Sequence, residues 1–351
     1  MNHHAVVLAL LSAALFGIST PAAKALLGTI EPTVLAGLLY CGAGIGVALL
    51  RRLARPLFVR EGSAETPLGR PDWPWLAGAI IAGGILGPIL LMFGLSRTDA
   101  AAASLLLTFE GVATALLAWF VFHENFDRRV ALGIACLVAG ALVLSWSGTP
   151  TIAGLVGPLA IIGACIAWGL DNNLTRKISL ADPLQIVELK GLIAGPVNLL
   201  LGLWVGGAIP AVTPLVAAGI VGFLGYGVSL ALFVVALRHL GTARTGAYFS
   251  TAPFIGAVAA LLLLREPITV QLVASGLLMG LGVWLHLTED HNHEHVHETL
   301  QHSHRHVHDE HHQHVHGPDA PPGEPHTHWH HHERLKHKHP HVPDMHHTHG
   351  H

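Results

Sequence analysis

Charged residues are scarce in this sequence. Asp, Glu, Lys and Arg make up only 12% of its 351 residues, about half the usual share in a soluble protein. Hydrophobic residues account for 51%. This composition excludes an ordinary water-soluble globular protein.

Cysteine and the common enzyme motifs are also scarce. The three cysteines, Cys41, Cys136 and Cys165, lie inside apolar runs and show no CxxC spacing, so there is no disulfide framework or cysteine zinc site. No strongly basic stripe is present, which excludes nucleic-acid binding. The apolar part has no P-loop, nucleophile elbow or HExxH motif, so we expect a non-enzyme that requires no cofactor.

The remaining charge is unevenly distributed. Residues 1–288 contain 15 Lys or Arg and 12 Asp or Glu, whereas residues 289–351 contain 4 and 10. Of the 29 histidines, 24 lie in the last 63 residues. The sequence therefore divides into a long apolar part and a short, acidic, histidine-rich tail.

The apolar part contains runs long enough to cross a bilayer, which takes about 20 residues as a helix. We predict an all-α membrane protein with ten spans, at about 5–23, 32–50, 75–95, 100–122, 130–147, 153–170, 184–206, 213–236, 244–264 and 269–288. With a cytoplasmic N-terminus, eleven Lys or Arg fall in inside loops and three (Lys24, Arg97, Arg265) in outside loops. This asymmetry predicts that both termini are cytoplasmic, in the inner membrane of the cell.

The spans form an internal repeat. At an offset of 142 residues, Leu95 matches Leu237, Glu124 matches Glu266 and Gly140 matches Gly282. Earlier in each half the offset is 152, and Lys24 matches Arg176. We predict five-helix repeats at 1–148 and 149–288, followed by the tail at 289–351. Because five is odd, the second repeat is inverted, an arrangement suited to alternating access around a central site.

The repeat resembles the EamA branch of the drug/metabolite transporter superfamily. The resemblance covers residues 5–288 and rests on LLLTFEGVATALLAWFVFHENFDRRVALGIACLVAGALVL (105–144) and LLLLREPITVQLVASGLLMGLGVWL (261–285). Its hallmark is a fourth helix ending in an acidic residue, a place held here by Glu124 and Glu266. Gly111 departs from the family pattern, which often has Pro there, whereas the second copy has Pro253. The resemblance implies a carrier of small solutes and does not identify the solute.

Ionisable residues within the spans are the candidate transport residues. Glu110 lies near the middle of the fourth span, and Glu188 and Lys190 lie in the seventh. Such groups are costly in lipid unless they face protein or water, and burial of Glu110 favours its protonated form, as proton coupling needs. Glu188 and Lys190 point about 200° apart on a helix and should not pair directly. The alternative is a structural role, for instance an ion pair between Glu110 and Lys190.

Polar residues at span ends form a second group. Asp171 and Asn172 are expected to close the sixth span on the inside, where they either end the helix or take part in gating. Glu124 and Glu266 stand at span ends, where each is expected to cap a helix or to pair with Arg128 or Arg265.

The tail is too polar to bury a core, so we expect it to be disordered. Imidazole suits zinc, nickel and cobalt, and alternate residues of an extended chain share a side. We therefore expect loose, exchanging metal sites, and the candidate ligands are His291, His293, His295, His297, His302, His304, His306, His308, His311, His312, His314 and His316.

Two functions remain open at this stage. The first is a secondary carrier of a small metabolite, driven by protons, with a metal-binding tail. The second is a divalent-metal exporter whose tail collects nickel, cobalt or zinc, although no cluster of His or Cys lies mid-span. The expected partners are the solute, the lipid bilayer and divalent metal ions. The sequence leaves open whether the unit acts alone or as a homodimer.

Overall fold

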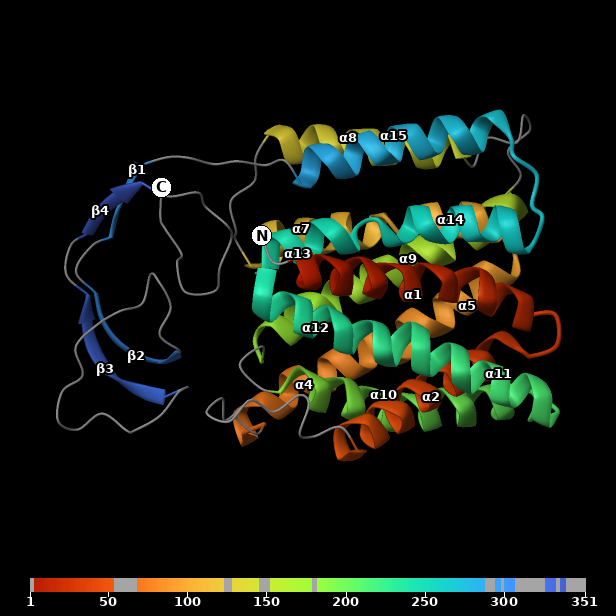
Figure 1. The fold of residues 1–351 in the computed structure, drawn as a ribbon, viewed down its shortest axis with the longest axis horizontal. Helices are drawn as coiled ribbons and strands as arrows, with labels where there is room; N and C mark the ends of the chain where they lie inside the picture. Colours follow the sequence, from red (N-terminus) through yellow and green to blue (C-terminus); the bar gives the residue numbers. More distant parts are fainter. Residues whose placement is uncertain are drawn as a thin grey trace.

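We analysed a computed structural model of the chain. It describes residues 3–53, 68–122, 128–144, 152–178, 182–240 and 242–287, and four tail segments, 294–297, 300–306, 326–332 and 335–338. The apolar part is entirely helical in its described residues, and its helices run roughly parallel or antiparallel to one another (Figure 1).

The helices fall into two successive series. The first contains α1 (His3–Leu26), α2 (Pro32–Leu53), η1 (Arg70–Asp72), α4 (Trp73–Ala79), η2 (Ile80–Leu86), α5 (Gly87–Ser96), α6 (Ala100–Leu106), α7 (Phe109–Phe122) and α8 (Arg128–Leu144). The second contains α9 (Ile152–Arg176), α10 (Pro183–Trp204), α11 (Val212–Gly222), η3 (Phe223–Val228), α12 (Ser229–Leu240), α13 (Thr242–Phe249), α14 (Ala252–Leu263) and α15 (Val270–Leu287).

These helices match the ten predicted apolar runs in place and order. Among the described residues, six helices are long and apolar enough to span a membrane, and four shorter apolar helices lie at Ala100–Thr114, Ala131–Leu144, Ala252–Leu263 and Val270–Leu285. The chain is therefore a multi-pass integral membrane protein, while the count of ten crossings stays a prediction. The start of α1 and the end of α15 lie at the same end of the bundle (Figure 1).

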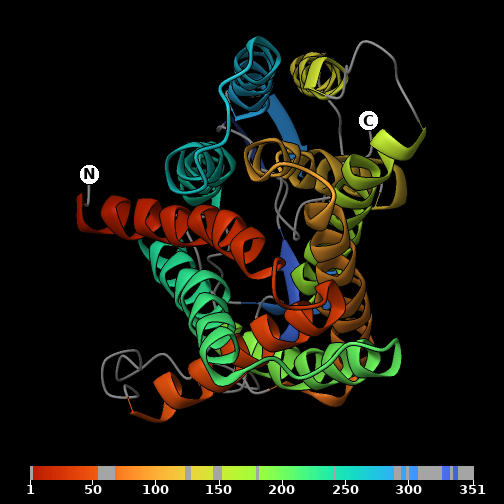
Figure 2. The ribbon, with the colours of Figure 1, turned by 90° about the vertical axis from the view of Figure 1, so that its right-hand side faces the viewer.

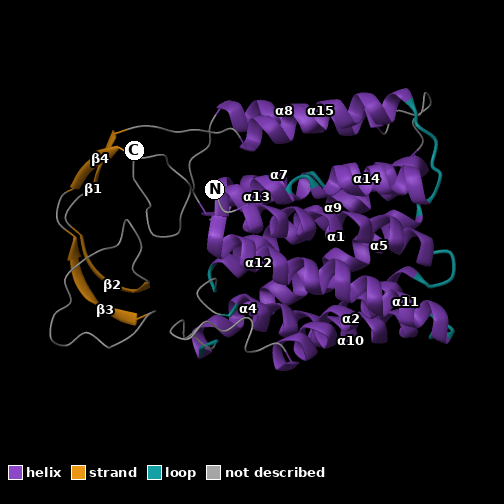
Figure 3. Ribbon diagram, viewed as in Figure 1, coloured by secondary structure: helices purple, strands orange, loops and turns teal. Residues whose placement is uncertain are grey.

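Two irregularities occur at matching places in both series. The third span contains a π-helical segment, η2 in the first series and η3 in the second. The fourth span is broken at Leu107–Thr108 between α6 and α7, and at Ser250–Thr251 between α13 and α14 (Figure 3). The apolar periodicity did not predict either feature, because a broken helix keeps the same apolar composition.

Most of the extensive helix packing joins one series to the other. Helix α1 packs on α12 and α14 of the second series, and α9 packs on α5 and α7 of the first (Figure 2). Ser12 and Ser229 fasten α1 to α12 from inside the bundle. Each hydroxyl donates to the other's backbone carbonyl, at 2.6 Å from Ser12 and 3.0 Å from Ser229. The two series therefore exchange their first helices.

Glycines allow the closest helix contacts. A Cβ on Gly44 of α2 would lie 2.6 Å from the backbone of Gly191 in α10, and a Cβ on Gly17 of α1 would lie 2.4 Å from the carbonyl oxygen of Ala252. In lipid, where apolar helices gain little from hiding apolar surface, this close backbone approach supplies van der Waals contact. The helix pair α8 and α15 lies at one edge of the bundle (Figures 1 and 2).

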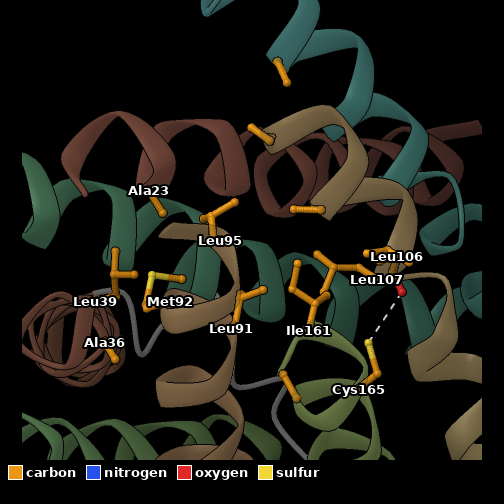
Figure 4. Packing of buried hydrophobic residues seen from close by; sticks show 14 of the residues in the cluster. Ala23, Ala36, Leu39, Leu91, Met92, Leu95, Leu106, Leu107, Ile161 and Cys165 are labelled. Atoms are coloured by element: carbon orange, nitrogen blue, oxygen red, sulfur yellow. Dashed lines mark hydrogen bonds between the residues drawn. The ribbon is translucent and has the colours of Figure 1, made fainter. Parts of the chain in front are cut away.

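The main core joins both series. Leu39, Leu91 and Leu106 of the first series pack with Ile161 of α9, and all four are fully or almost fully buried (Figure 4). This layer fixes α9 against α5 and the α6–α7 break, which positions the polar side chains described below.

The tail contains regular structure where none was expected. Strands β1 (Glu294–His297) and β4 (Leu335–Lys338) pair antiparallel, as do β2 (Leu300–His306) and β3 (His326–His332) (Figure 3). Alternation of His with other residues suits a strand, whose side chains alternate between two faces. For these four segments the expectation of a fully disordered tail is wrong, and for the tail outside them it stays a prediction.

Candidate functional site

The break in the fourth span places Glu110 in the first turn of α7. At the break, the Thr108 hydroxyl donates to the carbonyl of Leu105 at 2.8 Å, and the backbone N–H of Glu110 donates to Leu107 at 3.0 Å. The Cys165 thiol contacts the Leu106 carbonyl at 3.6 Å (Figure 4). Because the N-terminal end of a helix favours negative charge, the break creates a favourable place for a carboxylate inside the membrane.

The Glu110 carboxylate is bound by a neutral partner. The Asn172 amide of α9 donates to Glu110 at 3.1 Å and also contacts the Thr114 hydroxyl at 3.1 Å. Glu110 is half-buried and Asn172 is exposed. A Cβ on Gly111 would meet no atom within 4 Å. Protein atoms therefore cover Glu110 only in part, and the neighbouring Gly111 faces open space.

Asp171 and Lys190 form a charged pair beside Glu110. The Lys190 ammonium lies 2.6 and 2.5 Å from the two carboxylate oxygens of Asp171. The side chain of Lys190 is 16% exposed and that of Asp171 is 7% exposed. Glu110 interacts electrostatically with both residues. Lys190 thus binds Asp171 directly rather than Glu110, the partner considered from the sequence.

The expectation that Asp171 and Asn172 end the sixth span is wrong. Helix α9 continues to Arg176, so both residues lie inside it. The helix continues because its polar side chains have partners there. Thr175 donates to Asp171 at 2.9 Å, and the Asn173 amide donates to the carbonyls of Gly169 and Thr114 at 2.8 and 3.1 Å. Asp171 and Asn172 therefore face α10 and α7 from within the helix.

Aromatic rings lie next to these charges. Tyr40 and Tyr226 have ring centroids 5.8 Å apart, and Phe16 lies 5.8 Å from Tyr226 and 5.4 Å from Phe249. Tyr40 interacts electrostatically with Asp171 and Glu110, and Tyr226 interacts with Glu110. All four rings are half-buried. The site thus has a charged side from α7, α9 and α10 and an aromatic side from α1, α2, η3 and α13.

The π-helical segment η2 offers carbonyls to the same region. Pro88 follows this segment and has no N–H, so the preceding turn lacks one helical donor. The Gly83 carbonyl accepts from the Tyr40 hydroxyl at 2.8 Å and from the Trp168 indole at 2.9 Å. The Gly84 carbonyl accepts from the Asn198 amide at 2.9 Å. Side chains of α2, α9 and α10 are therefore attached to one point on the third span.

Glu188 lies apart from this site. Its carboxylate and that of Asp182, the N-cap of α10, both bind Arg51 of α2. Glu188 and Lys190 have separate partners, as their spacing predicts. Glu188 therefore belongs to an ion-pair group joining the end of α2 to the start of α10.

Glu266, from the second series of helices, caps a helix of the first series. Its carboxylate accepts the backbone N–H groups of Ala100 and Ala101, at 2.7 and 2.8 Å, at the start of α6. The carbonyls of Leu95 and Thr98, at the end of α5 and in the following turn, accept from Lys24 at 2.7 and 2.8 Å. Both ends of the α5–α6 turn are thus held by charged groups. Glu124 and its predicted contacts lie outside the described residues.

The tail histidines are only partly described. His295 and His297 lie on β1, and His302, His304 and His306 lie on β2. The other candidate ligands, His291, His293, His308, His311, His312, His314 and His316, lie outside the described residues. Within the described part of the chain, no group of three or more His, Cys, Asp or Glu is arranged to hold a metal ion.

Several site residues were not predicted from the sequence. In the sequence, little distinguishes Thr114, Asn198 and Gly83 from other residues of apolar helices. Their roles depend on the break and on the π-helical segment. Arg51 counted only toward loop charge. Asn198, a polar amide within an apolar run, is the one signal that could have been followed.

A helical bundle that crosses the membrane several times, with a broken span and buried charges at its centre, defines a membrane transporter. The chain belongs to the EamA-like transporter family, which matches residues 3–146 and again residues 155–288. This confirms the resemblance inferred from the two sequence motifs.

Two relatives agree with this assignment, and a solved structure shares the fold. An "Uncharacterized transporter" of Methanothermobacter thermautotrophicus is 30% identical over 77% of this chain and 82% of its own length. The "Uncharacterized transporter YvbV" of Bacillus subtilis is 25% identical over 77% of this chain and 87% of its own length. A crystal structure with 17% identity superposes with a TM-score of 0.60, covering 81% of this chain and 95% of the other. Both relatives are named as transporters.

Proposed function

We propose that the chain is a proton-coupled secondary transporter that moves a small metabolite across the inner membrane by alternating access. The observation that carries the proposal is Glu110, a half-buried carboxylate at a helix break, bound by the neutral amide of Asn172. Broken helices that present their ends to a solute are a recurrent device of secondary transporters.

Exchange of helices between the repeats suggests the moving bodies. Helices α1, α12 and α14 pack together, as do α9, α5 and α7. We expect these two groups to tilt against each other around the close contact of α2 and α10. Glu110 belongs to α7 in one group. Tyr226 belongs to η3, which continues directly into α12 of the other group. Solute access between these two residues would therefore change as the groups tilt.

The transport test uses full-length protein in reconstituted vesicles with a pH gradient, screened against a metabolite panel. We expect solute flux that dissipates the pH gradient and is lost in Glu110→Gln. Glu188→Gln serves as the comparison, because Glu188 binds Arg51 away from the site. Solute flux with unchanged proton coupling in Glu110→Gln would disprove the proton role, and absence of flux for every solute would count against transport.

The orientation is tested separately. Leu53, at the end of α2, is 81% exposed, and Ile209, beyond the end of α10, is 64% exposed. In a variant without the three native cysteines, we expect Leu53→Cys to react only from the cytoplasmic side and Ile209→Cys only from the outside. The reverse pattern would show that the termini are outside.

We also propose that the tail binds Zn, Ni or Co. The strand register supports this, because His302 pairs with His330, His304 with His328 and His306 with His326. Directly paired residues on antiparallel strands lie on the same face of the ribbon, about 5 Å apart at Cβ. Deletion of residues 289–351 should remove metal binding by the purified protein. If deletion alters metal tolerance and the vesicles carry metal but no metabolite, a divalent-metal exporter replaces the metabolite carrier.

A further inference from the structure

The charges at the centre of the bundle do not balance. Asp171 and Lys190 neutralise each other through two close contacts. Glu110 accepts its hydrogen bond from the uncharged amide of Asn172. With Glu110 ionised, the three residues carry two negative charges and one positive charge. The site is neutral only when Glu110 binds one proton or one other monovalent positive charge.

The charge count selects among ions. An uncompensated charge within a membrane helix is strongly disfavoured, so an ionised Glu110 requires a positive partner. One monovalent cation restores neutrality, whereas a divalent metal would leave an excess positive charge. The donors at Glu110 are one carboxylate, one amide and one hydroxyl, from Glu110, Asn172 and Thr114. This sparse set fits a hydrogen-bonding ammonium group better than a metal ion.

The aromatic side indicates the rest of the solute. Tyr40 and Tyr226 both interact electrostatically with Glu110, and Phe16 and Phe249 continue the series of rings away from it. Aromatic faces attract ammonium groups, and the rings beyond offer apolar surface to a hydrocarbon or aromatic portion.

We propose that this site binds a monovalent organic ammonium ion with an apolar or aromatic portion, in exchange for one proton at Glu110. The inference rests on the proposed transport function and adds the solute class and the stoichiometry. In the exchange, the O–H bond of the protonated carboxyl breaks, the proton passes to water, and the resulting carboxylate binds the ammonium. Charge is conserved, because one positive charge replaces another.

Within the described part of the chain, several groups from other helices interact with Glu110. Helix α9 contributes Asp171, Asn172 and Cys165, helix α10 contributes Lys190, and Tyr40 and Tyr226 come from α2 and η3. Asp171 and Lys190 bind each other, and the thiol and phenols are neutral near pH 7. Glu110 is therefore the group whose protonation changes when the cation binds.

The test measures binding and proton release by full-length purified protein in weakly buffered detergent solution. The probes are methylammonium, benzylammonium and phenethylammonium, with 2-phenylethanol as a neutral analogue. We expect tighter binding as the apolar portion grows. At pH values below the titration of Glu110, where the test is run, we expect one proton released per ammonium bound and about tenfold weaker binding for each further pH unit. The alcohol should bind at least tenfold more weakly and release no proton.

Variants separate the site from general folding effects. Glu110→Gln should lose both binding and proton release, Glu110→Asp should keep proton release with weaker binding, and Glu31→Gln, at the start of α2, should match the native protein. Equal binding of the alcohol and the ammonium ions, binding without proton release, or no binding by any of the three ammonium ions would overturn the inference. If vesicles carry a neutral solute that no ammonium inhibits, the inference fails while the transport function stands.

Discussion

The carboxylate of Glu266 lies 2.7 Å from the backbone nitrogen of Ala100, so the segment that follows α14 holds the beginning of α6. A second contact, to Ala101, is 2.8 Å long. Both N–H groups belong to the first turn of a helix and have no partner within it. One side chain therefore joins the fourth spans of the two repeats.

Substitution of Glu266 should show a graded loss of stability. Gln keeps one acceptor oxygen and loses the charge, while Ala loses both hydrogen bonds. We expect a loss of about 1 kcal/mol for Glu266→Gln and about 2 kcal/mol for Glu266→Ala, because charged hydrogen bonds to helix N-termini are the stronger kind. Thermal unfolding in detergent checks the order. Equal stability of all three proteins would show that the cap has no energetic role.

The Asp171–Lys190 pair should behave as a unit. Asp171→Asn leaves the Lys190 ammonium without a charged partner in a largely buried place, so we expect a loss of about 3 kcal/mol or more. The double variant Asp171→Asn, Lys190→Met removes both charges and should recover much of that loss. A double-mutant cycle of unfolding midpoints measures the coupling, and strictly additive single effects would contradict the pairing.

The Gly83 carbonyl should tolerate the loss of one donor better than the loss of both. Tyr40→Phe and Trp168→Phe each remove one of its two side-chain hydrogen bonds. We expect each variant to lose about 1 kcal/mol of unfolding free energy, because the carbonyl keeps its other partner. The double variant should lose more than the sum of the two single losses. Trp168→Phe also shrinks a buried ring, so Trp168→Leu in the Tyr40→Phe background serves as a control for ring volume.

Two glycines on one interface provide a matched pair for close packing. A Cβ on Gly42 would lie 2.4 Å from the carbonyl oxygen of Gly219, whereas a Cβ on Gly219 would meet nothing within 4 Å. Gly42→Ala should cost about 1–3 kcal/mol through overpacking. Gly219→Ala should be neutral, or stabilising by up to about 1 kcal/mol through helix propensity. Equal effects on thermal unfolding would contradict the close approach of α2 and α11.

The apolar periodicity predicted the helical runs because each run is a continuous stretch of hydrocarbon-compatible residues. The α6–α7 break and the η2 segment could not be predicted in this way. Leu107 and Thr108 do not disfavour a helix, and the break depends on tertiary contacts such as that of Cys165 with Leu106. Pro88, which has no backbone N–H, and the nearby glycines suit an irregular third span, and the structure shows the partners of its free carbonyls.

The candidate site was predicted in composition and not in pairing. Glu110, Asp171, Asn172 and Lys190 were identified because polar groups are costly in a span. Their pairing depends on how α9 is rotated relative to α7 and α10. Tertiary packing sets this rotation, so the residues around each site position in the sequence do not reveal it. Asp171 was placed at a helix end because its partner, Lys190, lies on another helix.

Exchange of first helices imposes an order on biosynthesis. The ribosome releases α1 before any other span, yet the backbone carbonyl that receives the Ser12 hydroxyl belongs to Ser229 and is made only when the eighth apolar run emerges. Until then, the leading span rests in lipid with the Ser12 hydroxyl and the close-packing surface at Gly17 uncovered. The first span inserted is among the last to be locked in place, so a chain that stalls before residue 229 would present an unsatisfied helix to the quality-control proteases of the membrane.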